Sequence, residues 1–563
     1  MKRLCTLIAL AAPTSAAAQD WAPGEQIDEA AAIQITRAGF ESAADLAAVL
    51  IPGAIDIPVF EEKVKDPLFG STLAEIKFEK GWVAIEIAEA QLIPGNGLLD
   101  LDMDLNVQLN DSNDRFELYI ELLGIGDTCY GWVDPFPVNA ITSIAMQVVE
   151  ESDGTKLIDA QVGAIEVDFD LSSDDIELKD CAIGTLEDVL NYLNLSLYDL
   201  ILGQVDGLIK DAIGDAAPEL ETALSEAFSA ASINETFSVG DAELSLSLQP
   251  DDLAITPDGM EIKMAGSTVS DPSDCVSAYD TGGSLKTMTA VPGVNSAQDG
   301  VGILLSDDFA NQALYSLWRS GLLCYTLDDS ESLPLNTAIL GLLAGDSFDQ
   351  FFPSPQPIII ATKPEFAPVI SYDGTYDVTA EIPGLGLDIF AELDGRWTRL
   401  LGLTLDAEVG IDLNFNGATG VLGVELFFDT EAIGVSVGFN ELAPEANDVV
   451  IEKFSTVFGS LVEPLIGGLL GEDLSFALGS LEGVGLTSLE AAPAGSGDWL
   501  ELSAGLGAVP YEGCSGGGCG ADGADSGCSG EGEEGSECSA IHGHSRTIWL
   551  LPLGLVALLR RRR

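Results

Sequence analysis

The longest helical pattern in the chain runs from Thr185 to Phe228. Apolar residues recur there at steps of three and four, and charged or amide side chains fill the positions between them, which predicts a long amphipathic helix. Pro218 suits the first turn of a helix, so we expect a break there and a shorter helix after it. The predicted apolar stripe consists of Leu186, Leu190, Leu193, Leu197, Leu200, Val205, Leu208, Ile209, Ala212 and Ile213. A stripe of this length needs apolar strands to cover it.

A period of two residues dominates the segment from Ser71 to Leu178. Leu98 to Leu109 alternates almost without error, with Leu, Met and Val on one face and Asp, Asn and Gln on the other. Such alternation predicts antiparallel strands with one buried and one solvated face. Further strand patterns lie at 237–248, 260–265, 358–439, 474–489 and 499–506.

Three more helices complete the pattern. They are predicted from Arg37 to Ile51, from Asp307 to Leu323 with Ser306 as N-cap, and from Glu445 to Leu470. The order helix, strands, long helix, final strands therefore occurs twice, which predicts two similar domains at 19–266 and 301–506. Residues 267–300, rich in Ser, Asp, Thr and Gly, are typical of a linker.

Both ends of the chain carry targeting patterns. Lys2 and Arg3, an apolar run and a small-residue site give residues 1–18 the layout of a secretory signal peptide, with cleavage after Ala18. Residues 507–546 form a low-complexity tail rich in Gly, Ser, Glu and Cys, and 547–563 hold a short apolar helix and a terminal Arg cluster. The apolar run is short for a membrane span, but the arginines would keep this end cytoplasmic while the body lies outside. One interpretation is a plain tail anchor.

The charge balance of the chain argues against some classes of binding partner. The chain has 92 acidic and 23 basic residues, and a body this acidic repels phosphate backbones and anionic lipid surfaces. We therefore expect no nucleic-acid partner and no electrostatic docking on membranes. The hydrophobic content of 47% argues against disorder.

The cysteines divide into a body set and a tail set. Cys129, Cys181, Cys275 and Cys324 lie in the body, where three pairings are open. We favour Cys129 with Cys181 and Cys275 with Cys324, because each pair then stays within one half of the chain. Disulfides fit a body outside the cytoplasm.

The body lacks the residues of common catalytic and metal sites. The two histidines, His542 and His544, lie in the tail, so the body offers no Ser-His-Asp, Cys-His or histidine metal arrangement. Carboxylate pairs of the glycosidase kind stay open, but the sequence singles out none. We expect no enzyme activity, no cofactor and no metal.

One segment imitates a calcium loop. Asp412 to Gly417 opens like such a loop, but the twelfth position is Gly423 where the motif has Glu. Asn416-Gly417 between alternating runs favours a hairpin turn.

Several stretches resemble the bactericidal/permeability-increasing protein and lipid-transfer protein family of the tubular lipid-binding superfamily. They are Ile33 to Phe40 with the Ala-rich helix after it, Pro218 to Glu221, Phe237 to Met264 and Ser306 to Leu327. The resemblance implies an α+β fold of two similar domains in a boomerang, each a long helix wrapped by a strongly twisted antiparallel sheet, joined by a central sheet. It also implies an apolar lipid pocket in each domain and a disulfide like Cys129–Cys181. The chain lacks the basic tip with which some members bind lipopolysaccharide.

The resemblance makes acyl chains of lipids the expected ligand. Candidate wall residues are Phe40, Leu50, Leu197, Ile201, Val205, Leu208, Phe309, Trp318, Phe454, Val457 and Leu461. Gly203, Gly207 and Gly214 leave room beside the first long helix. The alternative is a structural or adhesive surface protein whose pockets are filled by its own side chains.

The end of the chain resembles the C-terminal sorting signals of Gram-negative bacteria, particularly the myxobacterial type. That resemblance implies a sorting protease that acts near a tail cysteine, with Cys538 as the candidate. We accordingly expect secretion across the inner membrane and retention at the cell surface or outer membrane, or in the periplasm.

Overall fold

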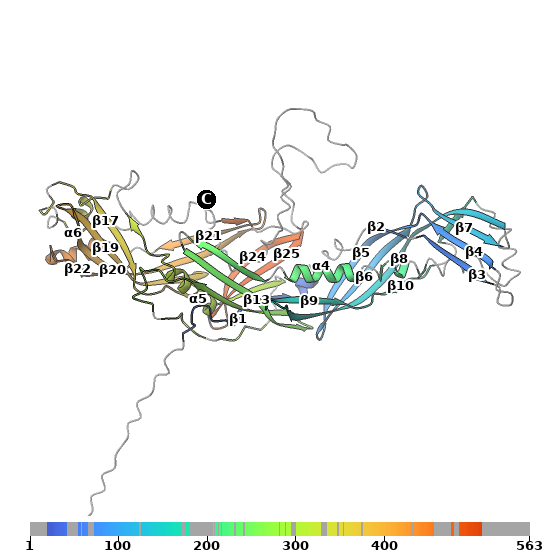
Figure 1. Ribbon diagram of the computed structural model, residues 1–563, viewed down its shortest axis with the longest axis horizontal. Coiled ribbons are helices and arrows are strands. Elements are labelled where there is room, and N and C mark those ends of the chain that lie inside the picture. The colour runs from blue at the N-terminus through green and yellow to red at the C-terminus, as the bar shows by residue number, and fades with distance from the viewer. Residues whose placement is uncertain are drawn as a thin grey trace, which may run out of the picture.

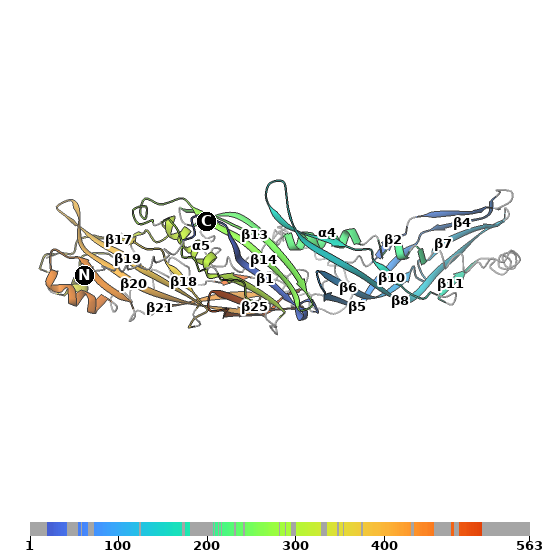
Figure 2. The same ribbon diagram turned by 90° about the horizontal axis from the view of Figure 1, so that it is seen from below.

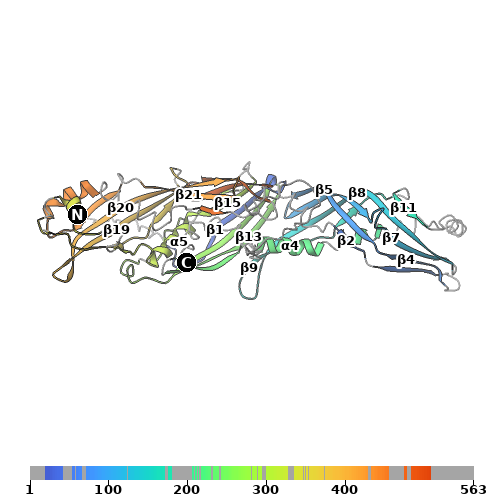
Figure 3. The ribbon, with the colours of Figure 1, turned by 90° about the horizontal axis from the view of Figure 1, so that it is seen from above.

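The computed structural model shows an elongated molecule built mainly of β-sheet, with the first half of the chain at one end and the second half at the other (Figures 1, 2 and 3). It describes residues 20–41, 54–57, 59–65, 72–122, 125–171, 175–180, 206–207, 209–211, 213–214, 217–229, 232–239, 242–280, 282–287, 289–293, 300–327, 335–345, 348, 350–352, 354–372, 375–428, 433–454, 475–477 and 484–508. The predicted signal peptide, most of both predicted long helices and the whole tail from 509 onward lie outside these residues.

The first half forms a ten-stranded sheet organised along one strand of 26 residues, β8 (Ile125–Glu150). Strands β6 and β7 pair with successive segments of one edge of β8. Strands β9, β10 and β11 pair with successive segments of its other edge. The remaining strands are β2 (Ala54–Asp56), β3 (Phe60–Lys65), β4 (Thr72–Glu79), β5 (Trp82–Pro94), β6 (Leu98–Leu109), β7 (Phe116–Leu122), β9 (Lys156–Val162), β10 (Glu166–Asp168) and β11 (Ile176–Lys179). All pairings are antiparallel, as the alternating pattern predicts.

A seven-stranded sheet joins the two halves, in the order β12-β13-β14-β1-β15-β25-β24. Its strands are β12 (Ile233–Val239), β13 (Ala242–Thr256), β14 (Gly259–Ser270), β1 (Ile27–Thr36), β15 (Val301–Ser306), β25 (Trp499–Ala508) and β24 (Val484–Ala494). Ile33 of β1 pairs with Ile303 of β15 at its centre. Outward from this pair, β14 and β13 of the first half mirror β25 and β24 of the second, so the repeated order in the sequence becomes an approximate twofold arrangement.

The second half forms an eight-stranded sheet dominated by the hairpin of β19 and β20. Its strands are β16 (Thr326–Leu327), β17 (Ile358–Pro364), β18 (Val369–Ser371), β19 (Val378–Leu393), β20 (Arg396–Asn416), β21 (Val421–Phe428), β22 (Gly434–Phe439) and β23 (Ser475–Ala477). Residues 417–420 form the turn between β20 and β21, where Thr419 N and Gly420 N donate to the carbonyl oxygen of Asn416. The hairpin turn predicted here is therefore confirmed.

The described helices lie against these sheets. They are α4 (Ala217–Ser229), α5 (Asp307–Arg319), α6 (Ala338–Ala344), the 3-10 turn η1 (Pro444–Ala446) and the helical residues 37–41, 206–207, 209–211, 213–214 and 447–454. The predicted cap of α5 is confirmed, because the N–H of Phe309 donates to Ser306 Oγ at 3.2 Å. The same hydroxyl donates to the carbonyl oxygen of Ala30 in β1 at 2.9 Å, which fixes α5 to the central sheet.

Three predicted boundaries were wrong. The tail expected from residue 507 can begin only after β25, which continues to Ala508. The linker expected at 267–300 begins inside β14, which continues to Ser270 because Thr268 and Ser270 are buried and hydrogen-bond to Ser316 of α5. The helix expected to reach Leu323 ends at Arg319, where Ser320 is its C-cap.

The Cys275–Cys324 disulfide predicted from the sequence is present, with Cα atoms 6.4 Å apart. Cys129 is also disulfide-bonded. Its predicted partner, Cys181, lies outside the described residues.

Candidate functional site

The inner face of the ten-stranded sheet is predominantly apolar among the side chains that the structure describes, with Thr142 of β8 as a buried polar residue on it. In β6 the odd-numbered residues from Leu99 to Leu109 are at most 3% exposed, while the aspartates between them face outward or are half-buried. Neighbouring strands continue the face because antiparallel pairing places side chains of the same parity side by side. Its buried residues include Val83 and Ile85 of β5, Phe116, Leu118 and Ile120 of β7, Phe136, Val138, Ala140, Ile144 and Met146 of β8, and Ile158 and Ala160 of β9.

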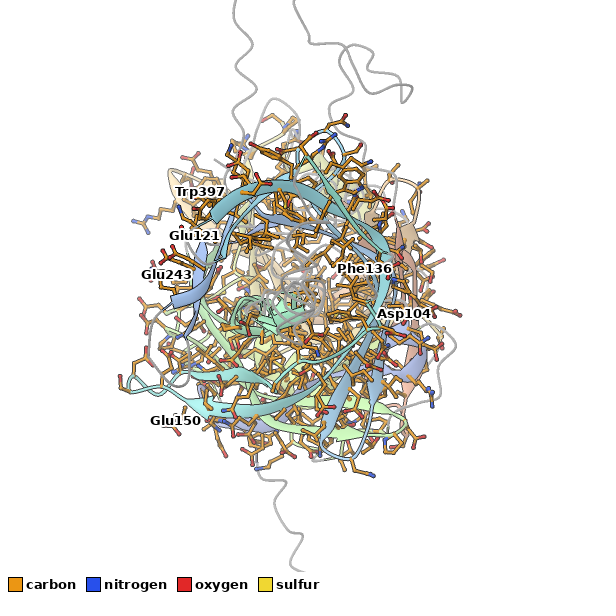
Figure 4. All side chains as sticks on the ribbon, turned by 90° about the vertical axis from the view of Figure 1, so that its right-hand side faces the viewer. Asp104, Glu121, Phe136, Glu150, Glu243 and Trp397 are labelled. Atoms are coloured by element: carbon orange, nitrogen blue, oxygen red, sulfur yellow. A yellow bond between two sulfur atoms is a disulfide. The ribbon has the colours of Figure 1, made fainter. Side chains whose placement is uncertain are left out.

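The sheet curls around this apolar face. Seen along the long axis, β8 curves round the molecule with Phe136 on its inner side and Asp104 and Glu150 on the outside (Figure 4). The strands β5, β6 and β8 thus form a curved wall with a dry inner surface and a carboxylate-rich outer one.

Hydrogen bonds across the outer face hold its carboxylates in place. Asn139 Nδ2 donates to Asp102 Oδ1 at 2.8 Å and to Asp104 Oδ1 at 3.2 Å. Ser143 Oγ donates to Asp100 Oδ1 at 2.6 Å. These aspartates therefore form part of a solvated surface, and within the described residues no group of three or more His, Cys, Asp or Glu side chains is placed to hold a metal ion.

A helical layer covers part of the inner face. Ile209, Ile213 and Leu220 are buried, and Leu224 and Phe228 are half-buried against the same core. Ile209 and Ile213 lie four residues apart, as do Leu220, Leu224 and Phe228 in α4, so each set shares one side of its helical segment, while Lys210 and Thr222 are exposed. The described part of the predicted amphipathic stripe therefore faces the sheet, as expected.

Side chains of α4 satisfy the free edge of β9. Glu221 Oε2 accepts from the N–H of Val162 at 3.2 Å, and Ser225 Oγ accepts from the N–H of Ala160 at 3.0 Å. An exposed strand edge would otherwise present unpaired donors. These two contacts fix the position of α4 on the sheet.

The segment around β10 forms an apolar margin of the wall. Ile165, Val167, Phe169 and Leu171 are half-buried, and the acidic residues that alternate with them are exposed. The Phe169 ring lies 5.5 Å from the ring of Phe136, and Lys210 Nζ lies 5.4 Å from the Phe169 ring centroid. Phe169 therefore bridges the inner face of the sheet and the helical layer.

Two glycines of the helical layer border open space. Apart from its own helix, no atom of the described residues lies within 4 Å of a Cβ atom placed on Gly207 or on Gly214. Both glycines are half-buried. A side chain at either position therefore has room, as the sequence predicts.

The candidate wall residues fall into separate groups. Phe40 and Phe309 are each 3% exposed and belong to the large core shared by the first half and the central sheet. Phe454 packs in the core of the second half, and Trp318 packs in a small cluster beside the disulfide loop. The other seven candidates lie outside the described residues: Leu50, Leu197, Ile201, Val205, Leu208, Val457 and Leu461.

Sequence reasoning missed the strand residues of the inner face as candidate ligand contacts. Met103, Phe136 and Ile158 follow the period-two signal that any buried strand face gives, so their apolar character did not distinguish a binding surface from a core. In the sequence the apolar residues of the β10 segment alternate with acidic residues, and in the structure they are half-buried. Their partial exposure distinguishes them from the fully buried residues of the inner face.

Among the described residues no helix is long and apolar enough to cross a membrane. The apolar segment at 547–563 is not part of that description.

No protein-family description and no curated protein sequence matches the chain. The chain is similar to several solved structures, among them the following three. A crystal structure of lipopolysaccharide binding protein has 13% identity and a TM-score of 0.48, over 86% of this chain and 100% of that one. P47 of Clostridium botulinum E1 has 10% identity and a TM-score of 0.24, over 85% of this chain and 99% of that one.

The third structure is Takeout 1 of Epiphyas postvittana, with 11% identity and a TM-score of 0.21, over 34% of this chain and 89% of that one. All three TM-scores lie below 0.5. These similarities therefore carry no argument about function, and only the side chains of this chain can support one.

Proposed function

We propose that this protein binds or transfers lipid, holding acyl chains against the inner face of its curled sheets. The observation that carries the proposal is the continuous apolar face from β5 to β9, bordered at β10 by half-buried apolar residues and at Gly207 and Gly214 by open space. The half-buried apolar residues of this margin remain accessible to an acyl chain.

The energetics suit a neutral or zwitterionic lipid. An acyl chain of about fifteen methylenes gains roughly 10 kcal/mol on leaving water, before ordering costs are subtracted. No basic side chain is needed for that gain. The carboxylates of the outer face, such as Asp100, Asp102 and Asp104, would repel an anionic headgroup.

The proposed role is binding without a chemical step. In this proposal the body lies outside the cytoplasm once residues 1–18 have been cleaved. A sorting protease then processes the tail at Cys538, and the body stays at the cell surface, in the outer membrane or in the periplasm. Support for this part comes from the terminal sequences. The body between 19 and 506 also contains no histidine, which is consistent with a non-catalytic role.

The test is to purify the protein without detergent and to analyse it by native mass spectrometry and organic extraction. We expect a co-purifying lipid, or saturable uptake of a fluorescent fatty-acyl probe by the extracted protein. Absence of both would contradict lipid binding and would favour the structural or adhesive alternative.

A further inference from the structure

A second site lies beside α5, on the side of that helix that faces away from the sheet core. Trp318 follows Phe309 by about two and a half helical turns, so the two side chains point in opposite directions. Phe309 packs into the large core, whereas Trp318 lines a surface pocket of ≈ 410 Å³. The pocket is therefore separate from the inner face of the first-half sheet.

Aromatic rings form much of the pocket wall. Tyr315 and Trp318 come from α5, Tyr279 from the disulfide-bonded loop, and Phe366 from the segment before β18. The Tyr315 and Trp318 ring centroids are 5.5 Å apart, and each residue is 2% exposed. Phe366 is 56% exposed and stands at the rim.

Hydrogen bonds orient the two buried rings. Trp318 Nε1 donates to the carbonyl oxygen of Pro364 at 3.1 Å. The Tyr315 hydroxyl donates to Asp280, whose other carboxylate oxygen accepts from Arg319 Nε at 2.9 Å. Both residues line the pocket but are almost fully buried, so they form a fixed wall, and Phe366 at the rim supplies the exposed π surface.

The polar groups of the pocket favour a cation. Two carboxylate side chains, Asp20 and Glu365, line it, and among the described lining residues there is no lysine or arginine. Asp280 and Arg319 neutralise one another beneath it, and Lys286 lies over the Trp21 ring, 3.6 Å from its centroid. Aromatic faces beside carboxylates attract organic ammonium groups through the ring quadrupole and charge.

One buried hydroxyl lacks a partner. Ser284 is 4% exposed and lines the pocket, and its Oγ has no hydrogen-bond partner among the described residues. A buried hydroxyl without a partner is costly, and an oxygen of a ligand would satisfy it. Its neighbour Gly283 cannot carry a side chain without shifting the chain, because a Cβ there would lie 2.7 Å from the carbonyl oxygen of Trp21.

We propose that this pocket binds a methylated ammonium group that carries a nearby oxygen, with Trp318, Tyr315 and Phe366 against the cation, Asp20 and Glu365 as its counter-charges and Ser284 bonded to the oxygen. The group could belong to a free compound such as choline or to the headgroup of a zwitterionic lipid. The site does not depend on the proposed acyl-chain binding, so either can fail alone.

The first test is calorimetric titration of the purified full chain with choline and with its neutral carbon isostere, in which carbon replaces the ammonium nitrogen. We expect choline to bind and the isostere to bind more weakly by roughly fivefold or more, since only the cation interacts with the ring quadrupoles. Equal binding of the two compounds would overturn the assignment of a cation site.

Variants locate the binding. Phe366→Leu keeps an apolar rim but removes the ring, and should weaken choline binding roughly two- to fivefold. Glu365→Gln and Ser284→Ala should weaken it too. The control is Phe351→Leu, at a ring that is 49% exposed and is not among the pocket residues. Equal effects of Phe366→Leu and Phe351→Leu would contradict the site.

The source of the group is tested with phosphatidylcholine vesicles and, as a comparison, phosphatidylglycerol vesicles. Retention on the first only, reversed by free choline, supports a lipid headgroup as the source. Choline binding without vesicle retention supports a soluble compound. If neither choline nor phosphatidylcholine vesicles bind, the proposal is wrong.

Discussion

Gly39 and Gly300 touch at the point where the first helix leaves the central sheet. A Cβ atom on Gly39 would lie 2.2 Å from the carbonyl oxygen of Gly300. That oxygen also accepts hydrogen bonds from the N–H of Thr36 at 2.8 Å and from Thr36 Oγ1 at 3.1 Å. The strand end, the helix start and the segment that leads into β15 therefore share one contact without room for a methyl group.

Gly39→Ala should destabilise the protein by about 1 to 3 kcal/mol, because the added methyl group forces two backbones apart. Urea unfolding followed by tryptophan fluorescence measures the change. The matched control is Gly207→Ala, also in a helix but bordering open space. It should stabilise by up to about 1 kcal/mol, since alanine favours helices. A neutral Gly39→Ala would show that this contact relaxes freely.

Asp307 should make stability depend on pH. Burial raises the pKa of its carboxyl to about 6, although the hydrogen bond from Thr287 opposes the shift. The folded state thus holds a proton between the ordinary carboxyl pKa and about 6, and its stability falls as the pH rises through that window. Asp307→Asn keeps the shape and removes the charge.

In the unmodified protein, this carboxyl group should make the free energy of unfolding lower at pH 7.5 than at pH 4.5. In the Asp307→Asn variant that contribution is absent, so the difference between the two pH values should change by up to about 3 kcal/mol in favour of pH 7.5. Denaturant curves of both proteins at the two pH values measure this difference. Asp168→Asn, at an exposed carboxylate of β10, serves as the control. Parallel pH profiles for the Asp307→Asn variant and the unmodified protein would contradict the burial effect.

The Cys275–Cys324 bridge should stabilise the second half. It closes a loop with a sequence separation of 49, and replacing both cysteines with serine should cost about 2 to 4 kcal/mol. The double variant is preferable to a reducing agent, because Cys129 is disulfide-bonded as well. Thermal unfolding of the variant and the unmodified protein provides the comparison. An unchanged melting temperature would mean that packing around Val276 and Trp318 suffices without the bond.

Phe169→Ser should lower the affinity for an acyl probe by about tenfold, because the half-buried ring contributes to the apolar margin beside β10. Asp168→Asn is again the control, one residue away and exposed. Fluorescence titration gives both affinities, and thermal unfolding shows whether each variant is folded.

A second variant distinguishes a loss of acyl-probe binding from a loss of folding. Gly207→Leu adds a side chain where a Cβ has no neighbour within 4 Å among the described residues outside its own helix. It should therefore leave the protein folded and at least as stable, while it occupies the space beside the helix and abolishes binding of the acyl probe. If both variants bind the probe as the unmodified protein does, acyl chains bind elsewhere.

Local patterns in the sequence were sufficient for several features. The alternation in β6, the Ser306 cap of α5 and the Cys275–Cys324 pair were all correctly predicted. Each depends on residues close in sequence or on few possible pairings. Repetition of the element order likewise anticipated the mirrored strands of the central sheet.

The length of β8 was not predictable in this way. Pro135 and Pro137 interrupt its pattern, and proline ordinarily marks the end of a strand. In the structure β8 carries one extra residue where its pairing with β6 shifts, between Phe136 and Val133, and Pro135 lies in this stretch. On the other side of β8, neither β10 nor β11 pairs with residues 134–138. A bulge in β8 itself and the gap between β10 and β11 thus accommodate Pro135 and Pro137, which lack an N–H.

The pocket beside α5 was also beyond reach of the sequence. Its rings come from Tyr279, Tyr315, Trp318 and Phe366, which belong to three separate segments. The disulfide, the packing of α5 against β18, and the hydrogen bonds of Trp318 to Pro364 and of Tyr315 to Asp280 bring these segments together. Trp318 alone was singled out beforehand, as a wall residue of an acyl-chain pocket.

The antiparallel pairing of β1 with β15 sets the order in which the protein can be completed during synthesis. β1 emerges near the beginning of the chain, but the strand for its second edge, β15, emerges only at residues 301–306, and β25 follows at 499–508. Until then the growing chain carries an unpaired sheet edge, which is prone to pair with other chains. A nascent chain of this protein should therefore depend on a chaperone until its final strand has been made.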